Sequence, residues 1–126
     1  MKTRRESGRA AQQFGMSAEE QAVAALQQDG WTVLARRLRT PAGEIDLVAE
    51  QDGLLVFIEV KARPSLAEAA FALGARQRAR LLAAAEIALA THPEWVSACI
   101  RFDVLVVDRQ GRVRRIADAF RMQADE

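Results

Sequence analysis

The chain has 126 residues, 18 basic and 17 acidic side chains and a formal net charge of +1, and half of its residues are hydrophobic. This composition is typical of a folded globular domain and excludes a disordered chain, and no apolar run approaches the roughly 18 residues of a membrane span. The single Cys99 excludes an internal disulfide, and the single His92 argues against histidine-based metal sites. We therefore expect any chemistry to come from carboxylates and lysine.

The N-terminal segment is basic, with four basic side chains and one acidic side chain in residues 1–9. We expect residues 1–14 to form a basic arm and residues 15–122 to form one domain, because no linker or composition break divides them. The arm lacks the apolar stretch of a secretory signal, so we expect a cytoplasmic protein.

Local signals predict one helix and one strand before the first turn. Ser17 with Glu20 three residues later is a capping-box pattern, which predicts a helix over residues 17–29. An imperfect alternation of apolar and polar residues predicts a strand over 31–38, and Thr-Pro-Ala-Gly at 40–43 predicts a turn.

Residues 44–61 have the pattern of a β-hairpin around Asp52-Gly53, a dipeptide that strongly favours a tight turn between strands. If Gln51 lies opposite Leu54, alternation of side chains puts polar residues on one sheet face, namely Glu44, Asp46, Glu59 and Lys61. The other face then carries an apolar set for the core, namely Ile45, Leu47, Ala49, Val56, Ile58 and Val60.

In this register Asp46 lies opposite Glu59, and Glu44 lies opposite Lys61. Two facing carboxylates repel each other, and a divalent cation such as Mg²⁺, which prefers oxygen ligands, would remove the repulsion. A raised carboxyl pKa is the alternative. The Lys61 ammonium could orient a water or stabilise charge on a phosphoryl oxygen, and a Glu44–Lys61 ion pair on an exposed face is the alternative for these two residues.

After the hairpin, an Ala-rich segment predicts a helix near 75–91, and two strands are expected at 99–108 and 113–116 around a Gln110-Gly111 turn. Cys99 is expected in the core, since it begins an apolar strand. The order α-β-β-β-α-β-β predicts an α/β (α+β layered) fold with a mixed central sheet flanked by helices.

Charge along the chain is uneven. Residues 44–61 hold five acidic side chains and one basic side chain, and arginines cluster on both sides. An acidic centre with basic flanks suits a cation-dependent enzyme that acts on a polyanion, and a solvated surface with random clustering is the alternative. Glu19 and Glu20, in the first turn of the first predicted helix, are either further acidic site residues or ordinary helix-capping residues.

Asp46, followed by Glu59-Val60-Lys61 on the next strand, resembles the D…(E)xK signature of the PD-(D/E)XK nuclease superfamily. A longer match, collinear over roughly residues 15–120, resembles the YraN-type family of small bacterial proteins. It includes Gly43-Glu44-Ile45-Asp46-Leu47, Phe57-Ile58-Glu59-Val60-Lys61 and Arg101-Phe102-Asp103. That family is usually placed among restriction-endonuclease-like folds, close in motif to archaeal Holliday-junction resolvases.

The resemblance implies an endonuclease-like protein that uses Mg²⁺ (or Mn²⁺) to cut DNA phosphodiesters, including branched or repair intermediates, and by analogy with resolvases a homodimer. It implies that Asp46, Glu59, Glu19 and the Val60 carbonyl hold the metal, and that Lys61 is the catalytic lysine. Glu44 would support this set. The residues expected to contact nucleic acid are Arg36, Arg37, Arg39, Arg63, Arg76, Gln77 and Arg80, with Gln77 standing where family members often have Lys.

Other functions remain open. A module of the same fold could bind branched or damaged DNA without cutting it. A protein-interaction domain could dock through the hairpin edge and the Ala-rich helix. A metal-dependent hydrolase of nucleotides is a further alternative.

Overall fold

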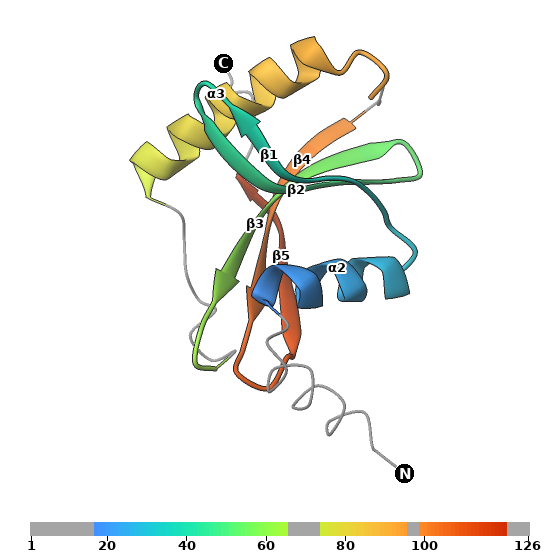
Figure 1. Cartoon of the computed structure of the whole chain (residues 1–126), viewed down its shortest axis with the longest axis vertical. Coiled ribbons are helices and arrows are strands. Elements are labelled where there is room, and N and C mark those ends of the chain that lie inside the picture. The colour runs from blue at the N-terminus through green and yellow to red at the C-terminus, as the bar shows by residue number, and fades with distance from the viewer. Residues whose placement is uncertain (1–16, 66–73, 96–98, 121–126) are drawn as a thin grey trace.

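The computed structural model describes residues 17–65, 74–95 and 99–120 (Figure 1). The elements follow the predicted order α-β-β-β-α-β-β, with bounds α2 Ala18–Gln28, β1 Thr32–Thr40, β2 Gly43–Gln51, β3 Leu54–Ala62, α3 Ala75–Thr91, β4 Cys99–Val107 and β5 Val113–Phe120. The predicted basic arm, residues 1–14, lies outside the described residues. Within the described ranges, no helix is long and apolar enough to cross a membrane.

The five strands form one mixed sheet in the order β1-β2-β3-β4-β5. β3 and β4 run parallel, and the other three neighbouring pairs are antiparallel. The chain between β3 and β4 includes α3, as a parallel connection requires a crossover. The predicted mixed sheet flanked by helices is therefore confirmed.

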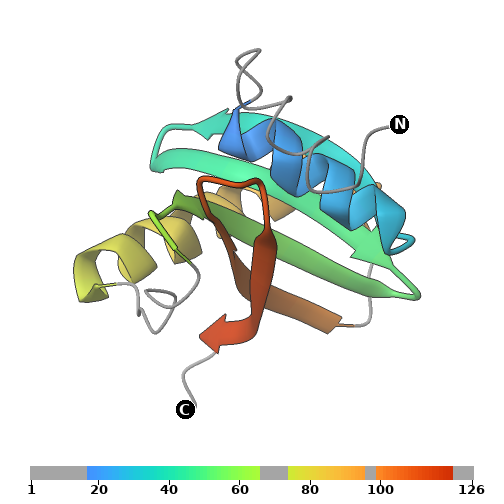
Figure 2. The same ribbon diagram turned by 90° about the horizontal axis from the view of Figure 1, so that it is seen from below.

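The two helices cover opposite faces of the sheet (Figure 2). On one face α2 packs Ala22, Val23 and Leu26 against a buried cluster that includes Leu47 and Ile58. On the other face α3 packs small side chains against Val48, Phe57 and Phe102, namely Ala84, Ala85 and Ala88. Because successive strand residues point to opposite faces, β2 and β3 are apolar on both sides over most of their length.

The capping-box prediction for α2 is confirmed. The Ser17 hydroxyl accepts a hydrogen bond from the Glu20 backbone N–H at 3.0 Å, and the Ser17 N–H donates to Glu20 Oε1 at 2.8 Å. Two N–H groups at the helix start are satisfied in this way. The start of α2 is thus set by local sequence, which places Glu19 and Glu20 in its first turn.

The hairpin register is confirmed where β2 and β3 pair regularly, from Gln51–Leu54 to Leu47–Ile58. Asp52 and Gly53 have φ of 51° and 80°. Positive φ at both central residues is the requirement of a type I′ turn, whose twist matches that of the flanking strands.

Beyond Leu47–Ile58 the structure differs from the ideal hairpin. The regular pairing ends there, and Ile45 packs in the α3-side cluster, whereas Leu47 packs on the α2 side. The expectation that both lie on one face was wrong. Neighbouring β1 explains the change: Arg37, which lies between the pairs Arg36–Leu47 and Leu38–Ile45, has a left-handed φ of 52°. This residue bends β1 beside Asp46.

Three boundary expectations also need correction. β1 continues to Thr40, whose hydroxyl accepts N–H bonds from Ala42 and Gly43 and donates to the Gly43 carbonyl, so the turn is held by the strand end. β5 continues to Phe120 because it pairs along β4. Cys99 is exposed and does not lie in the core, since it is the first residue of β4 and pairs with Leu54 at the margin of the sheet.

Candidate functional site

Asp46 lies where β2 and β3 cease to pair. Its Oδ2 accepts a hydrogen bond from the backbone N–H of Val60 at 2.8 Å, so the side chain bridges the two strands where their backbones no longer do. Burial raises the pKa of Asp46 to about 6. The Val60 hydrogen bond opposes this shift, and the negative charges of Glu59, Glu44 and Glu19 add to it.

Glu59 and Lys61 lie two residues apart on β3 and form an ion pair, with Lys61 Nζ 3.1 Å from Glu59 Oε2. The same oxygen accepts a hydrogen bond from Nε2 of Gln77 at 2.9 Å. Both members of the pair are largely buried, with 14% of the Glu59 side chain and 20% of the Lys61 side chain exposed. Gln77, in the first turn of α3, therefore contacts Glu59, one of the two carboxylates that the hairpin pattern predicted.

The structure distinguishes Glu19 from Glu20, which local sequence could not do. Glu20 is exposed and serves the capping box. Glu19 has a side chain only 12% exposed, its Oε1 accepts from Nε of Arg37 at 2.7 Å, and its Oε2 lies 3.7 Å from Nε of Arg36. That Oε2 is buried and has no hydrogen-bond partner among the residues that the structure describes. Glu19 is thus a buried acid near Asp46, and Glu20 is a capping residue.

The predicted nucleic-acid contacts fall into different environments. Arg36 and Arg37 both form ion pairs with Glu19. Arg39 forms an ion pair with Glu44 at 3.6 Å. The alternative pair of Glu44 with Lys61 is therefore not seen, because Lys61 pairs with Glu59. The regular pairing of β2 with β3 ends before Glu44, whereas its pairing with β1 continues to Gly43. Glu44 therefore lies beside Arg39, and Lys61 is left beside Glu59.

On α3, Arg76 and Arg80 are exposed, as residues that contact a nucleic-acid strand would have to be. Arg80 lies against the backbone of the hairpin: a Cβ placed on Gly43 would meet its Cγ at 2.9 Å. Gly43 also has a φ of 146°. The glycine thus allows the Arg80 stem to pass close to β2.

Comparison with known proteins identifies the family. The family model described as uncharacterised protein family UPF0102 matches residues 18–107. The chain belongs to this family. A UPF0102 protein of Granulibacter bethesdensis is 58% identical over 118 residues, which cover 94% of this chain and 75% of the relative. One of Azorhizobium caulinodans is 51% identical, with 90% and 87% covered. The resemblance to the YraN-type family is thereby confirmed.

The oxygen-rich set of this UPF0102 chain can be tested against the metal that the resemblance implies. Asp46, Glu59 and the Val60 carbonyl are hard oxygen donors of the kind that Mg²⁺ prefers. The charges that raise the pKa of Asp46 show that negative groups gather there, and a cation would relieve their repulsion. Among residues 17–65, 74–95 and 99–120, however, no three His, Cys, Asp or Glu side chains are placed to hold a metal ion. Mg²⁺ usually keeps several waters and binds through one or two carboxylates, and Asp46 and Glu59 are the two carboxylates of this set that could serve in that mode.

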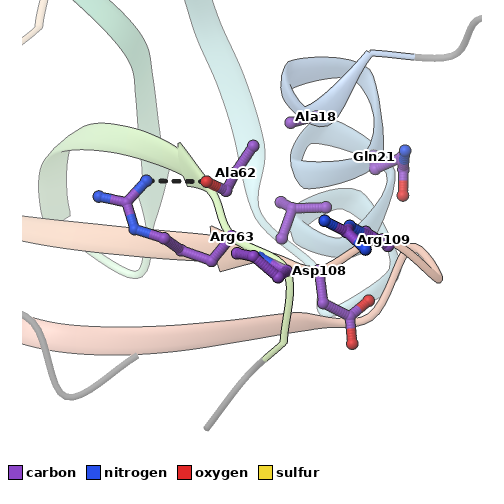
Figure 3. A pocket seen from close by; sticks show the side chains of 8 residues that line it. Ala18, Gln21, Ala62, Arg63, Asp108 and Arg109 are labelled. Atoms are coloured by element: carbon purple, nitrogen blue, oxygen red, sulfur yellow. Dashed lines mark hydrogen bonds between the residues drawn. The ribbon is translucent and has the colours of Figure 1, made fainter. Parts of the chain in front are cut away.

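Arg63 makes contacts with backbone carbonyls at the end of β3. It follows β3, its backbone N–H donates to the Val107 carbonyl, and its Nη1 donates to the Ala62 carbonyl at 2.7 Å. It lines an open hollow of about 600 Å³ between the start of α2 and the ends of β3 and β4 (Figure 3). Arg109 lines the same hollow. In the sequence, Arg109 is only one of the arginines that follow the acidic centre, and its place in the hollow depends on how three elements end together.

Arg101 and Asp103 of the UPF0102 motif form a structural pair. Nε and Nη2 of Arg101 each donate to a different oxygen of Asp103 at 2.8 Å, and the Asp103 side chain is only 1% exposed. Such a bidentate pair satisfies a buried carboxylate. The pair links two residues of β4, and we assign it a structural role.

Proposed function

We propose that the chain is an endonuclease-like enzyme that hydrolyses DNA phosphodiester bonds with Mg²⁺ (or Mn²⁺) as its cofactor. The observation that carries this proposal is the convergence of Asp46, Glu59 and Lys61 where β2 and β3 part, with Asp46 bonded to Val60 N–H and Lys61 bonded to Glu59. Two carboxylates and a lysine from adjacent strands are the groups that the D…(E)xK resemblance requires.

Asp46, Glu59 and the Val60 carbonyl are the residues that would hold the cation, and Glu19 is the further acid beside them. When bound, Mg²⁺ supplies Lewis-acid stabilisation of the negative charge that develops on the phosphate. The high pKa of Asp46 supports this assignment, since a nearby cation would favour its charged form.

Lys61 is the only lysine in the described part of the chain, and its ammonium is fixed by Glu59. A compact ammonium held in place can orient an attacking water or donate to a phosphoryl oxygen in the transition state. Gln77 fixes the same Glu59 oxygen from α3, so it keeps the carboxylate and the lysine in one arrangement.

DNA is proposed as the substrate because the acidic centre is bordered by arginines that can neutralise phosphates. Arg76 and Arg80 are exposed on α3, and Arg36 and Arg37 lie on β1 beside Glu19. Branched or repair intermediates, a homodimer and a cytoplasmic location are the finer parts of the proposal, and they rest on the resemblance.

A cleavage panel tests the proposal. Linear, nicked, flapped and four-way DNA, and RNA, are incubated with the protein in Mg²⁺ or Mn²⁺ and in chelator. We expect metal-dependent cutting of at least one DNA, and a loss of roughly hundredfold to thousandfold in Lys61→Ala, as for the loss of one transition-state donor. Lys61→Arg should fail to restore the rate, because the planar guanidinium cannot replace a point donor.

Glu50→Gln is the matched control for Asp46→Asn, because Glu50 lies on the same strand and outside the site. Cutting that survives in both Lys61→Ala and Asp46→Asn would contradict the proposed residues. Salt-dependent DNA binding without cutting in either metal would instead identify a non-cleaving module of the same fold. The absence of any DNA affinity would favour the protein-interaction domain.

A further inference from the structure

The hollow at the start of α2 is open to solvent and is lined by both apolar and polar side chains. Its volume of about 600 Å³ lies in the range of small-molecule sites. Four small or short apolar side chains line it, namely Ala18, Ala62, Pro64 and Val107. Small side chains leave space between α2 and the strand ends that larger ones would fill.

The polar side of the hollow is cationic. Arg109 is exposed, and no side-chain hydrogen bond or ion pair ties its guanidinium to another of the described residues. In Figure 3 the Arg109 side chain lies beside α2, whereas Arg63 extends away toward the Ala62 carbonyl. Arg109 is therefore the arginine available to a ligand in the hollow.

Asp108, the acidic residue that lines the hollow, repels a bound anion only weakly because its carboxylate is already paired. Asp108 accepts backbone N–H bonds from Gln110 and Arg112 through Oδ1, and its Oδ2 lies 2.7 Å from Nε of Arg112. Its negative charge is thus matched by a guanidinium. Arg114 and Arg115 are also exposed, on β5, but neither lines the hollow.

The hollow lies next to the candidate site along two elements. Ala18 precedes Glu19 on α2, and Ala62 follows Lys61 on β3. Because consecutive Cα atoms are about 3.8 Å apart, the hollow begins one residue from Lys61 along the β3 backbone, although the side chains at 61 and 62 point to opposite faces of the strand. An apolar wall with one cation beside it matches a nucleotide, which combines a flat base with a phosphate.

From these observations we infer that the hollow binds one nucleotide of the strand that lies at the carboxylate site, with Arg109 on its phosphate. The inference rests on the proposed function for the identity of the polymer. Arg109 becomes a binding residue outside the nuclease signature. The apolar wall contributes surface against which the base can pack, and such a wall does not select one base over another.

Titration with deoxyadenosine monophosphate, deoxyadenosine and inorganic phosphate tests the inference on the full chain, in chelator and without metal. We expect binding of the monophosphate at millimolar or better affinity, with each of the other two probes at least about tenfold weaker, because each lacks one half of the contacts. Amide shifts of Ala18, Ala62 and Val107 in nuclear magnetic resonance spectra should report the site.

Arg109→Ala should weaken binding of the monophosphate roughly tenfold or more, as for loss of a charge-assisted hydrogen bond. Ala62→Leu, at an exposed position, should weaken it by filling the hollow without a change of charge. Arg114→Ala is the matched control, an exposed arginine of the same hairpin that does not line the hollow, and should stay within about twofold.

Equal affinity for phosphate and the monophosphate, or no effect of Arg109→Ala, would overturn the inference. So would the absence of monophosphate binding at millimolar concentration. Asp46→Asn separates the two hypotheses, since it should abolish cleavage and leave nucleotide binding intact. If the chain binds the nucleotide but cuts no substrate, the inference about the hollow is supported, and only the proposed hydrolysis is contradicted.

Discussion

Gln77 in the first turn of α3 donates a hydrogen bond to Glu59 on β3, and the same Glu59 oxygen lies 3.1 Å from the ammonium of Lys61. One carboxylate oxygen thus has two donors, one from Lys61, two residues further along β3, and one from Gln77 on a helix that packs on the sheet. The position of α3 is thereby linked to the geometry of the hairpin residues.

Gln77→Ala should lower DNA cleavage by roughly tenfold to hundredfold, since a hydrogen bond to a charged group contributes about 1.5–3 kcal/mol. The fold should be retained, because Gln77 is only partly buried. Single-turnover kinetics measure the effect, and a shifted pH–rate profile would separate positioning of Glu59 from a general loss of structure. Gln27→Ala, at an exposed position of α2, is the control. An unchanged rate in Gln77→Ala would show that Lys61 alone fixes Glu59.

Asp46→Asn should raise the free energy of unfolding at pH 7.5 and change it little at pH 4. The pKa of Asp46 is raised from 3.8 to about 6 in the folded chain, so the native state holds this proton more tightly than the unfolded state. The corresponding stability is present at low pH and is lost as pH rises from about 4 to about 6. Asn stays neutral and can still accept from Val60 N–H.

Urea denaturation across pH 4–7.5 measures this difference, with Glu50→Gln as the control carboxylate. Millimolar Mg²⁺ should stabilise wild type at pH 7.5 and leave Asp46→Asn unaffected, because a ligand that binds the native state stabilises it. A difference between the two proteins that stays constant with pH would contradict the burial of a charged Asp46.

Arg37→Gly should be more stable than Arg37→Ala by about 1 kcal/mol, because glycine adopts the left-handed φ of 52° without steric cost. Both variants lose the ion pair with Glu19, so the comparison isolates the backbone. Equal denaturation midpoints and slopes for the two variants would mean that β1 straightens when the side chain is removed.

Gly53→Ala should destabilise the fold by about 1 kcal/mol although nothing lies within 4 Å of the added Cβ, because Gly53 has a φ of 80°. Gly74→Ala is the matched control: its Cβ also meets none of the described residues within 4 Å, and its φ is −68°. Thermal denaturation distinguishes them. A larger loss in Gly74→Ala would show that capping of α3 matters more than the turn.

Sequence predicts the parts of this fold that depend on neighbours along the chain. The Asp52-Gly53 pair fixes the turn and hence the register, and Ser17 with Glu20 fixes the start of α2. These two signals place Asp46 and Glu59 on adjacent strands and Glu19 in the first turn of α2, but they do not choose between Glu19 and Glu20.

The remaining features depend on tertiary structure. Arginine does not signal a left-handed φ, so the bend at Arg37 and the different packing of Ile45 could not be predicted. Strict alternation paired Lys61 with Glu44, but the strands diverge and Glu59 becomes the nearer partner. The hollow beside Arg109 requires the ends of three elements to meet, and no local pattern reports such a meeting.

The parallel pairing of β3 with β4 has a consequence for the order of folding. Asp46, Glu59 and Lys61 belong to a single hairpin, which forms by short-range contacts on a microsecond timescale. β4 can join β3 only after the intervening segment with α3 has closed a long loop, which is the slower kind of step. We therefore expect the nascent hairpin to bring its acidic side chains together first, and docking of α3 to deliver Gln77 to Glu59 afterwards.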